Sequence, residues 1–385
     1  MPALNRALRL ESPYTAEPLQ ALIARFGSPL FVTDCDVLRQ QYCALTSASP
    51  GVDLHYALKP LPNATVVQVL AREGSWFDLA TNAEVDLVRN AGIPAERCIH
   101  THPIKRDSDI RHALDYGVTT FVVDNPDEIA KFDIYRKRVR LLLRVSFRSQ
   151  EAIVDLSRKF GCDPQAAIGL MELSEKGGIR IAGLSFHVGS QVASPDKYVE
   201  AIATCGRLIS EARQRGLPPL EELDIGGGFP IDYLEPVPAI DGFCAPIRAA
   251  LARLSKGIRV IAEPGRYICG PAAISLATVM GRAKREDRWW YYLDDGIYST
   301  FSGQQYDKSR FPIEPVRGRD RPRQACVASG PTCDSFDVVA EDMPMPELEI
   351  GEILVARQIG AYTVSTATYF NFFPRAKVLA VNVEP

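Results

Sequence analysis

Short apolar segments alternate with amphipathic ones from about residue 36 to residue 270, and this alternation leaves few possible folds. Eight apolar segments are predicted strands: 53–58, 76–81, 98–103, 119–124, 139–147, 181–189, 222–228 and 259–265. Helical spacing, with Asn or Asp at several starts and Gly at several ends, is found in 63–74, 82–92, 126–132 and 196–216. Eight strand–helix units predict an α/β fold, a (β/α)8 barrel, whose active site gathers at the C-terminal strand ends.

The pattern changes after residue 272. Alternating apolar and polar residues, interrupted by Pro and Gly, occur in 274–281, 289–296, 347–358 and 376–383. The early run 31–34 precedes the first barrel helix and is a further candidate strand. We therefore predict a barrel over 35–272 and a β domain, sandwich-like or barrel-like, made of 1–34 and 273–385.

Composition excludes several classes of function. The net charge of -3 gives no positive field for nucleic acid or an anionic membrane. No segment offers the ~18 uninterrupted apolar residues of a membrane span, and no signal-peptide pattern is present. The nine cysteines form an odd set without CxxC pairs, which is typical of free thiols in a reducing compartment. We expect a cytoplasmic protein that acts on a small molecule.

Lys59 follows the first predicted strand and precedes Pro60, so its side chain should project from the barrel mouth. An ordinary surface lysine is the simplest interpretation of that position alone. A partly desolvated lysine, however, has a lowered pKa and an amine free to form a Schiff base. Lys59 is therefore a candidate for covalent cofactor attachment.

Two glycine-containing segments follow the last two strands. Gly226, Gly227 and Gly228 permit close backbone approach to an anion, although a tight turn explains them equally well. The eighth strand ends in AEPGR, where Arg266 suits a phosphate and Glu263 suits a protonated ring nitrogen. Neither a Walker loop nor a GxGxxG fingerprint is completed, which disfavours a nucleotide cofactor.

Histidines occur at two other strand ends. His187, in FHVGSQ, is placed to lie flat on an aromatic cofactor, with Ser190 as a hydrogen-bond donor to phosphate, although an isolated histidine of this kind is usually structural. His100 and His102 form an HxH pair that on a barrel can bind a divalent metal. No acidic ligand set accompanies them, so we predict no metal and keep a metal-dependent hydrolase as an alternative.

The C-terminal region holds three less specific candidates. Cys333 and Asp334 lie on the Gly/Pro turn SGPTCDSFD, Tyr362 lies between small residues in GAYT, and Tyr306 and Asp307 follow DDGIYSTFSGQQ.

Taken in order, the motifs HYALKP, FDLATNAEVDLV, FHVGSQ, LDIGGGFP, EPGRY, DDGIY, GPTCDSFD and GAYTVSTATYFNFF resemble the ornithine/lysine/diaminopimelate decarboxylase family. These are pyridoxal-phosphate enzymes with an alanine-racemase-like barrel and a β domain, and the resemblance runs from Val52 to Val381. It implies that Lys59 carries the cofactor, that His187 stacks on its ring, and that its phosphate is bound by Ser190, Gly226, Gly227, Gly228, Gly265, Arg266 and Tyr362.

The resemblance also assigns acidic residues. Glu263 would pair with the pyridine nitrogen, where racemases of this fold typically have arginine, so it favours decarboxylation. Asp78 and Glu84 match acidic positions near the active site. Cys333 would reprotonate Cα from the other subunit, so each site would be shared across a homodimer.

Substrate choice follows from the same resemblance. The motif GPTCDSFD has Asp334 directly after Cys333, as in family members that act on ornithine or lysine. Asp307, beside Tyr306, would be a second carboxylate for the distal ammonium of the substrate. A diamine product, as in polyamine biosynthesis, is expected. L-Ornithine to putrescine is the first expectation and L-lysine to cadaverine the next, since one methylene is worth only ~1–3 kcal/mol.

Other possibilities stay open. Residues 302–307 depart from the usual wording of ornithine enzymes, which leaves carboxynorspermidine, diaminopimelate, D-ornithine or a siderophore or antibiotic precursor as substrates. A non-catalytic homologue is a further alternative, but the joint retention of four residues argues against it: Lys59, Cys333, Asp334 and Arg266. Lys159 and Asp337 match an intersubunit contact of ornithine decarboxylases.

Overall fold

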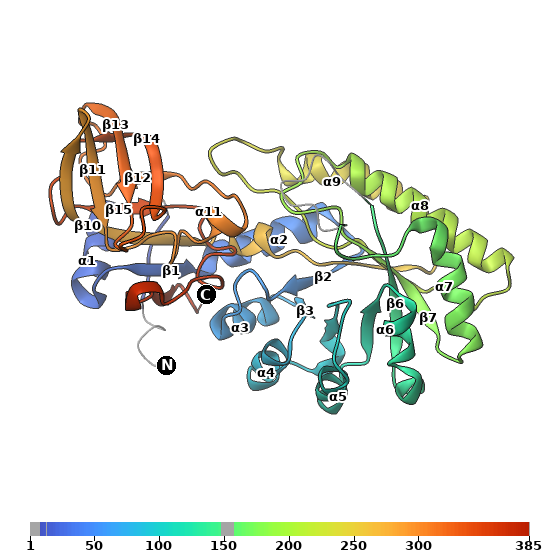
Figure 1. The fold of residues 1–385 in the computed structure, drawn as a ribbon. Helices are drawn as coiled ribbons and strands as arrows, with labels where there is room; N and C mark the ends of the chain where they lie inside the picture. The colour runs from blue at the N-terminus through green and yellow to red at the C-terminus, as the bar shows by residue number, and fades with distance from the viewer. Residues whose placement is uncertain (1–7, 13, 148–157, 385) are drawn as a thin grey trace. The chain divides into compact units, whose positions relative to one another are not determined.

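A computed structural model describes residues 8–12, 14–147 and 158–384 (Figure 1). The chain divides into two compact units. One comprises Tyr42–Pro230 and Val237–Tyr267, and the other comprises Met1–Gln41, Ile231–Pro236 and Ile268–Pro385. Residues 35–41, 231–236 and 268–272, which lie inside the range predicted for the barrel, thus belong to the second unit.

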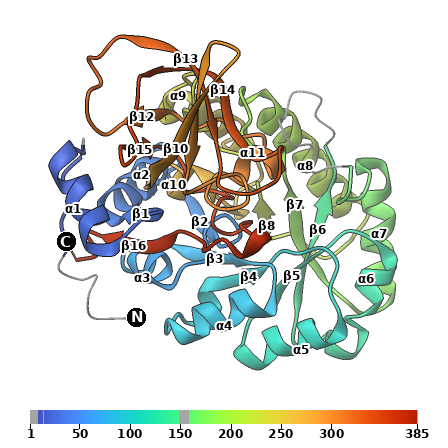
Figure 2. The same ribbon diagram turned by 60° about the vertical axis from the view of Figure 1, so that its left-hand side comes forward.

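The first unit is a closed barrel of eight parallel strands (Figure 2). Its strands are β2 (Val52–Ala57), β3 (Trp76–Leu79), β4 (Cys98–His100), β5 (Thr120–Val123), β6 (Arg140–Val145), β7 (Ile181–Phe186), β8 (Glu222–Asp224) and β9 (Arg259–Ala262). All eight predicted strands are confirmed. Several end before the polar residues assigned to them, such as Lys59 after β2, His187 after β7 and Glu263 after β9, whereas Asp78 lies within β3 and His100 within β4.

Apolar side chains fill the barrel. Ile99, Val122, Leu142 and Ile261, from four different strands, form one buried cluster. Parallel strands are covered on both faces, so they read as nearly continuous apolar runs. The interior is therefore packed, and chemistry is confined to the ends of the strands.

The helices between the strands are α3 (Ala64–Arg72), α4 (Asn82–Asn90), α5 (Asp107–Tyr116), α6 (Pro126–Ala130), α7 (Pro164–Lys176), α8 (Asp196–Gln214) and α9 (Ile240–Leu251). Capping side chains fix several starts: Asn63 accepts from the backbone of Thr65 and Val66, and Thr81 from that of Glu84. None of the helices in the described ranges is long and apolar enough to cross a membrane.

The second unit is built on a β-sheet. Its main path runs in the order β12 (Ile313–Pro315), β15 (Ile353–Ala356), β10 (Ala273–Arg285), β11 (Arg288–Leu293), β13 (Arg323–Ser329) and β14 (Val338–Pro346). Strand β1 (Leu30–Asp34) pairs with β10 and with β16 (Lys377–Val381), which confirms the early run as a strand of this unit. Strands β12, β13 and β14 were not predicted: β12 is only three residues long, β13 is a run of mostly small residues, and charged residues and prolines interrupt the alternation of β14.

The remaining α-helices in the described part of the chain are α1 (Ala16–Phe26), α2 (Cys35–Ala48), α10 (Arg266–Cys269) and α11 (Gly303–Tyr306), and three short 3-10 helices span 95–97, 133–135 and 370–372. Helix α1 packs through Leu19 and Leu22 on a core that contains Leu30, Leu276 and Val355. The first and last parts of the chain thus share one apolar core.

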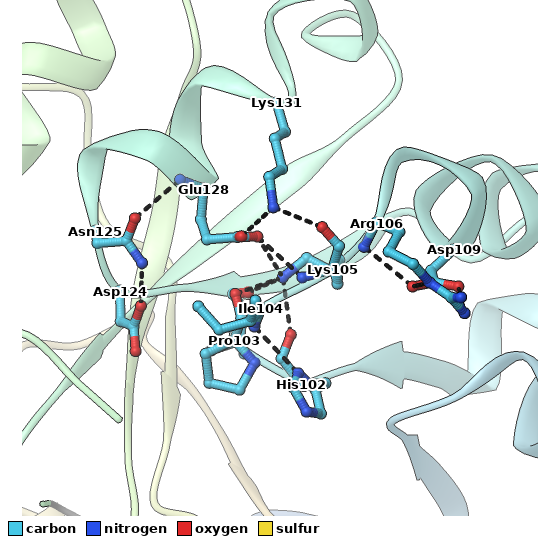
Figure 3. Close-up of polar contacts among 11 residues, drawn as sticks. His102, Pro103, Ile104, Lys105, Arg106, Asp109, Asp124, Asn125, Glu128 and Lys131 are labelled. Atoms are coloured by element: carbon cyan, nitrogen blue, oxygen red, sulfur yellow. Dashed lines mark hydrogen bonds and ion pairs between the residues drawn. The ribbon is translucent and has the colours of Figure 1, made fainter. Parts of the chain in front are cut away.

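A buried lysine fixes the loop between β4 and α5 (Figure 3). The Lys105 side chain donates to the carbonyl oxygens of His102 (2.8 Å), Pro103 (3.0 Å) and Val122 (2.6 Å). Lys105 is only 3% exposed, and burial lowers its pKa to about 8. Three carbonyl acceptors compensate much of the cost of placing a cation there.

Glu128, in α6, completes this arrangement. Its Oε2 accepts from the Lys105 backbone at 3.1 Å and lies 3.9 Å from the Lys105 Nζ. Lys131 donates both to the Lys105 carbonyl and to Glu128 (Figure 3). The loop after β4 is thus tied to the helix after β5.

We expect Lys105→Met to lower the free energy of unfolding by about 2–4 kcal/mol, because three buried carbonyls lose their donor and Glu128 loses a nearby cation. Urea denaturation measures this change. Lys176→Met, at an exposed position at the end of α7, is the matched control and should change stability by less than about 0.5 kcal/mol. Equal effects of the two substitutions would contradict the assignment.

Candidate active site

Lys59 and Asp78 form an ion pair at the mouth of the barrel. The Lys59 Nζ lies 3.0 Å from Asp78 Oδ2, and the side chains are 38% and 2% exposed. The strand pairing Ala57↔Asp78 sets this distance, since Lys59 comes two residues after Ala57. Thr101 donates its hydroxyl proton to the other oxygen of Asp78. The buried carboxylate thus lies between a hydroxyl and the half-buried Lys59 amine.

The three glycines after β8 make a cradle that side chains would fill. A Cβ on Gly227 would lie 2.5 Å from the Glu263 carbonyl oxygen and 3.3 Å from His187 Nε2. Gly226 and Gly228 have φ values of +67° and +117°, where only glycine is unstrained. A Cβ on Gly265 would lie 2.6 Å from Pro60, beside Lys59. Backbone therefore comes close to the mouth at these positions.

An arginine–serine pair lies next to this cradle. Arg266, 6% exposed, donates from Nη2 to Ser190 Oγ at 2.7 Å. Ser190 follows β7 and Arg266 follows β9, and these strands flank β8, which pairs with both and brings their ends together. A guanidinium, a hydroxyl and close glycine backbone are groups that bind phosphate.

His187 follows β7 on the same rim. Its Nδ1 accepts a hydrogen bond of 3.1 Å from the Gly189 backbone, so the neutral ring carries its proton on Nε2. Loss of hydration, with Arg144 and Lys59 nearby, lowers the pKa of His187 well below its usual value. The ring is therefore neutral at physiological pH, as suits stacking on an aromatic group.

Glu263 and Asp224 form a buried carboxyl pair. Asp224 accepts from Ser185 Oγ at 2.9 Å and from the Gly226 backbone at 2.8 Å, and it is hydrogen-bonded to Glu263. Burial, together with the charge of Asp224, raises the pKa of Glu263 well above its usual value. Glu263 therefore holds the shared proton, because two adjacent buried carboxylates cannot both ionise.

Two further ionisable groups lie at the mouth, Arg144 near this pair and Glu84 near Asp78 and Lys59. Arg144, on β6, lies within electrostatic reach of Glu263 and Asp224, and burial lowers its pKa. Glu84, in the first turn of α4, accepts from the Ala80 backbone at 2.6 Å. Burial raises the pKa of Glu84 to about 7. Both predicted acidic positions, Asp78 and Glu84, thus lie at the mouth.

Cys333 and Asp334 lie on a loop of the second unit. Cys333 is exposed, and its backbone amide donates to Asn371 Oδ1 at 3.1 Å. Asp334 accepts hydrogen bonds from the Tyr298 hydroxyl and the Phe336 backbone, and the Tyr298 bond lowers the pKa of Asp334. The thiol and an ionised carboxylate therefore stand side by side, and both line an open pocket of about 490 Å³.

The remaining predicted residues belong to the second unit as well. Asp307 accepts from Ser309 Oγ at 3.0 Å, and Tyr306, at the end of α11, is 61% exposed. Tyr362 has a left-handed backbone with φ 57°. Residues 308–309 and 335–336, which adjoin Asp307 and Asp334, line a common cavity of about 1080 Å³.

Comparison with known proteins now decides the family. Residues 36–270 match the family described as pyridoxal-dependent decarboxylase, pyridoxal binding domain. The chain belongs to the pyridoxal-dependent decarboxylases. It is thus an amino-acid decarboxylase with pyridoxal phosphate as cofactor, and the resemblance drawn from its motifs is confirmed.

Relatives match over almost the whole chain. Lysine/ornithine decarboxylase of Selenomonas ruminantium is 34% identical over 375 residues, which cover 95% of this chain and 93% of that protein. Two structures of lysine/ornithine decarboxylase from Vibrio vulnificus, one with putrescine and one with cadaverine, are each 52% identical, with TM-scores of 0.92 and 0.91. They cover 97% and 96% of this chain, and 100% and 97% of their own chains.

The barrel mouth fits pyridoxal phosphate on its own geometry. The cofactor carries a phosphate, an aldehyde and a basic ring nitrogen. The mouth offers the Arg266–Ser190 pair with the glycine cradle, the Lys59 amine beside Asp78, and the proton on Glu263.

The histidine pair does not resemble a metal site. The ring of His100 is 1% exposed and lies 5.7 Å from that of Phe121, and His102 Nδ1 accepts from the Ile104 backbone. Among the described residues, no group of three or more His, Cys, Asp or Glu side chains is arranged to bind a metal. His100 is instead a core histidine.

Asp337 is already engaged within its own chain. Its carboxylate accepts from the backbone amides of Ile297 (2.9 Å) and Thr332 (3.1 Å), and the residue is 1% exposed. Replacing Asp337 would therefore disturb the Cys333 loop directly, whatever its role in the predicted contact with Lys159. That contact stays a prediction.

Three site residues were not identified from the sequence. Asp224 and Arg144 each left a signal, a charged residue inside an apolar strand, which costs free energy unless the residue has a partner. Thr101 gave no such signal, because a threonine after a strand is common and does not indicate a site. Its contact with Asp78 depends on the pairing of β3 with β4.

We expect Glu84→Gln to stabilise the cofactor-free protein progressively as pH rises from about 4.5 to 7. In that range native Glu84 holds a proton that the unfolded chain releases, so ionisation favours unfolding. Urea denaturation should show similar stabilities at pH 4.5 and a variant more stable by about 3 kcal/mol at pH 8. A stability difference that is independent of pH would contradict this.

Proposed function

We propose that this chain decarboxylates a basic L-amino acid, with L-ornithine and L-lysine as substrates and putrescine and cadaverine as products. The observation that carries the proposal is the ionised Asp334 beside Cys333, since a carboxylate there suits a distal ammonium. The relatives from Vibrio vulnificus, seen with putrescine and with cadaverine, support the same substrate class.

We propose the following division of roles at the barrel mouth. Lys59 carries the cofactor, His187 stacks on its ring, and Glu263 passes its proton to the ring nitrogen. Asp78 orients the Lys59 amine. When bound, pyridoxal phosphate supplies an electron sink for the pair left at Cα as carbon dioxide departs. The phosphate is bound by Ser190, Gly226, Gly227, Gly228, Gly265, Arg266 and Tyr362.

Residues of the second unit act on the substrate side. Cys333 gives its Sγ proton to Cα after carbon dioxide leaves. Asp334 and Asp307, with Tyr306, bind the distal ammonium. Two carboxylates for one cation favour a diamine product over one that retains a distal carboxylate.

We further propose a homodimer in which Cys333 of one protomer completes the site of the other. Large exposed apolar side chains of the second unit support an interface there: Tyr306, Phe336, Tyr369, Phe370 and Phe372. All nine cysteines are free, as expected in the cytoplasm, and a diamine product suits polyamine biosynthesis.

Carbon dioxide release tests the function. We expect release from L-ornithine and L-lysine with added pyridoxal phosphate, and at least about 100-fold less from diaminopimelate, whose distal carboxylate would meet Asp334. D-Ornithine, arginine and carboxynorspermidine complete the panel. Lys59→Ala should abolish release, and Lys176→Met should not. No release from any substrate would refute decarboxylation, and release chiefly from another panel member would reassign the substrate.

Mixing two variants that each fail to form the amine tests the shared site. Lys59→Ala and Cys333→Ala homodimers, mixed and allowed to exchange subunits, should recover up to about a quarter of parental amine formation, since half the dimers are mixed and each has one intact site. Each variant mixed with itself is the control. No recovery, with exchange verified by mass spectrometry, would show that each site draws Lys59 and Cys333 from the same chain.

A further inference from the structure

The loop that carries Cys333 is supported by a residue far along the chain. The Cys333 backbone amide donates to Asn371 Oδ1 at 3.1 Å, across 38 residues of sequence. Cys333 is exposed, so its own side chain contributes little packing to hold the loop. The carboxamide of Asn371 therefore fixes the peptide from which the thiol projects.

The backbone of Asn371 suits this task. Its φ and ψ are 53° and 16°, in the left-handed region, which asparagine tolerates better than most residues. The next residue, Phe372, also has a positive φ of 56°, which is unusual for a bulky residue. Two successive left-handed residues turn the chain sharply, and this turn presents the carboxamide to Cys333.

The same segment supports the neighbour of Cys333. The ring of Phe370 stacks on Tyr298, with centroids 4.5 Å apart and planes at 25°. The Tyr298 hydroxyl donates to Asp334, and the Tyr298 carbonyl accepts from the Thr368 backbone at 2.8 Å. One segment, 368–371, thus holds Cys333 through Asn371 and Asp334 through Phe370 and Tyr298.

We propose that Asn371 is a positioning residue that directs the Cys333 thiol towards Cα of the substrate. This inference rests on the proposed role of Cys333 as proton donor. When the bond from Cα to the carboxylate breaks, carbon dioxide leaves and the electron pair passes to the cofactor. A proton from Cys333 Sγ to Cα then completes the amine.

A displaced thiol changes the destination of that proton. If the proton reaches the cofactor carbon instead of Cα, hydrolysis with one water yields an aldehyde and leaves the nitrogen on the cofactor as pyridoxamine phosphate. Atoms and electrons balance in both routes. The ratio of aldehyde to carbon dioxide therefore reports the position of the thiol, which overall stability does not.

Two substitutions separate the hydrogen bond from the backbone. Asn371→Gly retains the left-handed conformation and removes the acceptor, whereas Asn371→Asp retains an acceptor oxygen. With the holoenzyme and L-ornithine or L-lysine, we expect Asn371→Gly to raise the aldehyde fraction at least about fivefold, as for loss of one hydrogen bond, with KM changed less than about twofold. Asn371→Asp should restore the parental ratio.

The matched control is Glu286→Gly. Glu286 is exposed and has a left-handed backbone, with φ 49°, in the turn between β10 and β11 of the same unit. The Glu286→Gly variant also replaces a left-handed residue by glycine, but away from the Cys333 loop. The aldehyde fraction of this variant should equal that of the parent enzyme. Absorbance of the cofactor before and during turnover shows loading and the accumulation of pyridoxamine phosphate independently of rate.

Cys333→Ala, measured in parallel, distinguishes the role of Cys333 as proton donor from the role of Asn371 in positioning it. If it raises the aldehyde fraction and Asn371→Gly does not, the positioning role is refuted and the role of Cys333 stands. If Cys333→Ala leaves the fraction unchanged, the proposed proton donor is wrong, and the role of Asn371 fails with it. An increase in Asn371→Asp equal to that in Asn371→Gly would also refute the hydrogen bond as the cause.

Should Asn371→Gly not fold, Asn371→Ser replaces it. The serine hydroxyl is too short to reach the Cys333 amide, so the same increase in aldehyde is expected. A parental product ratio in a folded, cofactor-loaded Asn371→Ser would overturn the proposal.

Discussion

Closure of the eight parallel strands is the constraint on which the barrel and its site depend. Strand β2 pairs with both β3 and β9, so the first and last strands are neighbours. The Ala57 amide donates to the Pro264 carbonyl at 3.1 Å, which joins the strand before Lys59 to the loop after Glu263. Lys59 and Glu263, about 200 positions apart, thus lie at the same end of the barrel, because they follow strands that pair with each other when the barrel closes.

The mouth concentrates ionisable groups that a packed interior excludes. Asp78 lies between a lysine and a hydroxyl, whereas Glu263 keeps a proton because Asp224 lies against it. Similar carboxyl groups a few strands apart therefore have different neighbours. This difference lets one rim offer both a carboxyl group that orients the Lys59 amine and a proton for a basic ring nitrogen.

In the second unit, candidate site residues are positioned by hydrogen bonds between loops and not by the ends of barrel strands. Its functional candidates lie on loops, which a sheet and long-range hydrogen bonds hold in place. The Cys333 loop is fixed by Asp337 from within and by Asn371 from 38 residues away. Left-handed residues at 371 and 372 cost free energy that the surrounding packing must supply. Such loops are positioned by contacts distant in sequence, and local patterns indicate little about them.

The sequence by itself determined the eight-strand barrel, the early strand of the second unit, and the residues expected at the strand ends, because strand and helix periodicities and the order of motifs are local properties of the chain. Only the tertiary structure decided that Thr101 supports Asp78, that Asp224 holds Glu263 protonated, and that His100 is a core residue. It also corrected where strands end and revealed β13 and β14. The physical reason is that hydrogen-bond partners, burial and the resulting pKa shifts arise from strand pairing and loop closure, which join residues whose separation along the chain carries no signal.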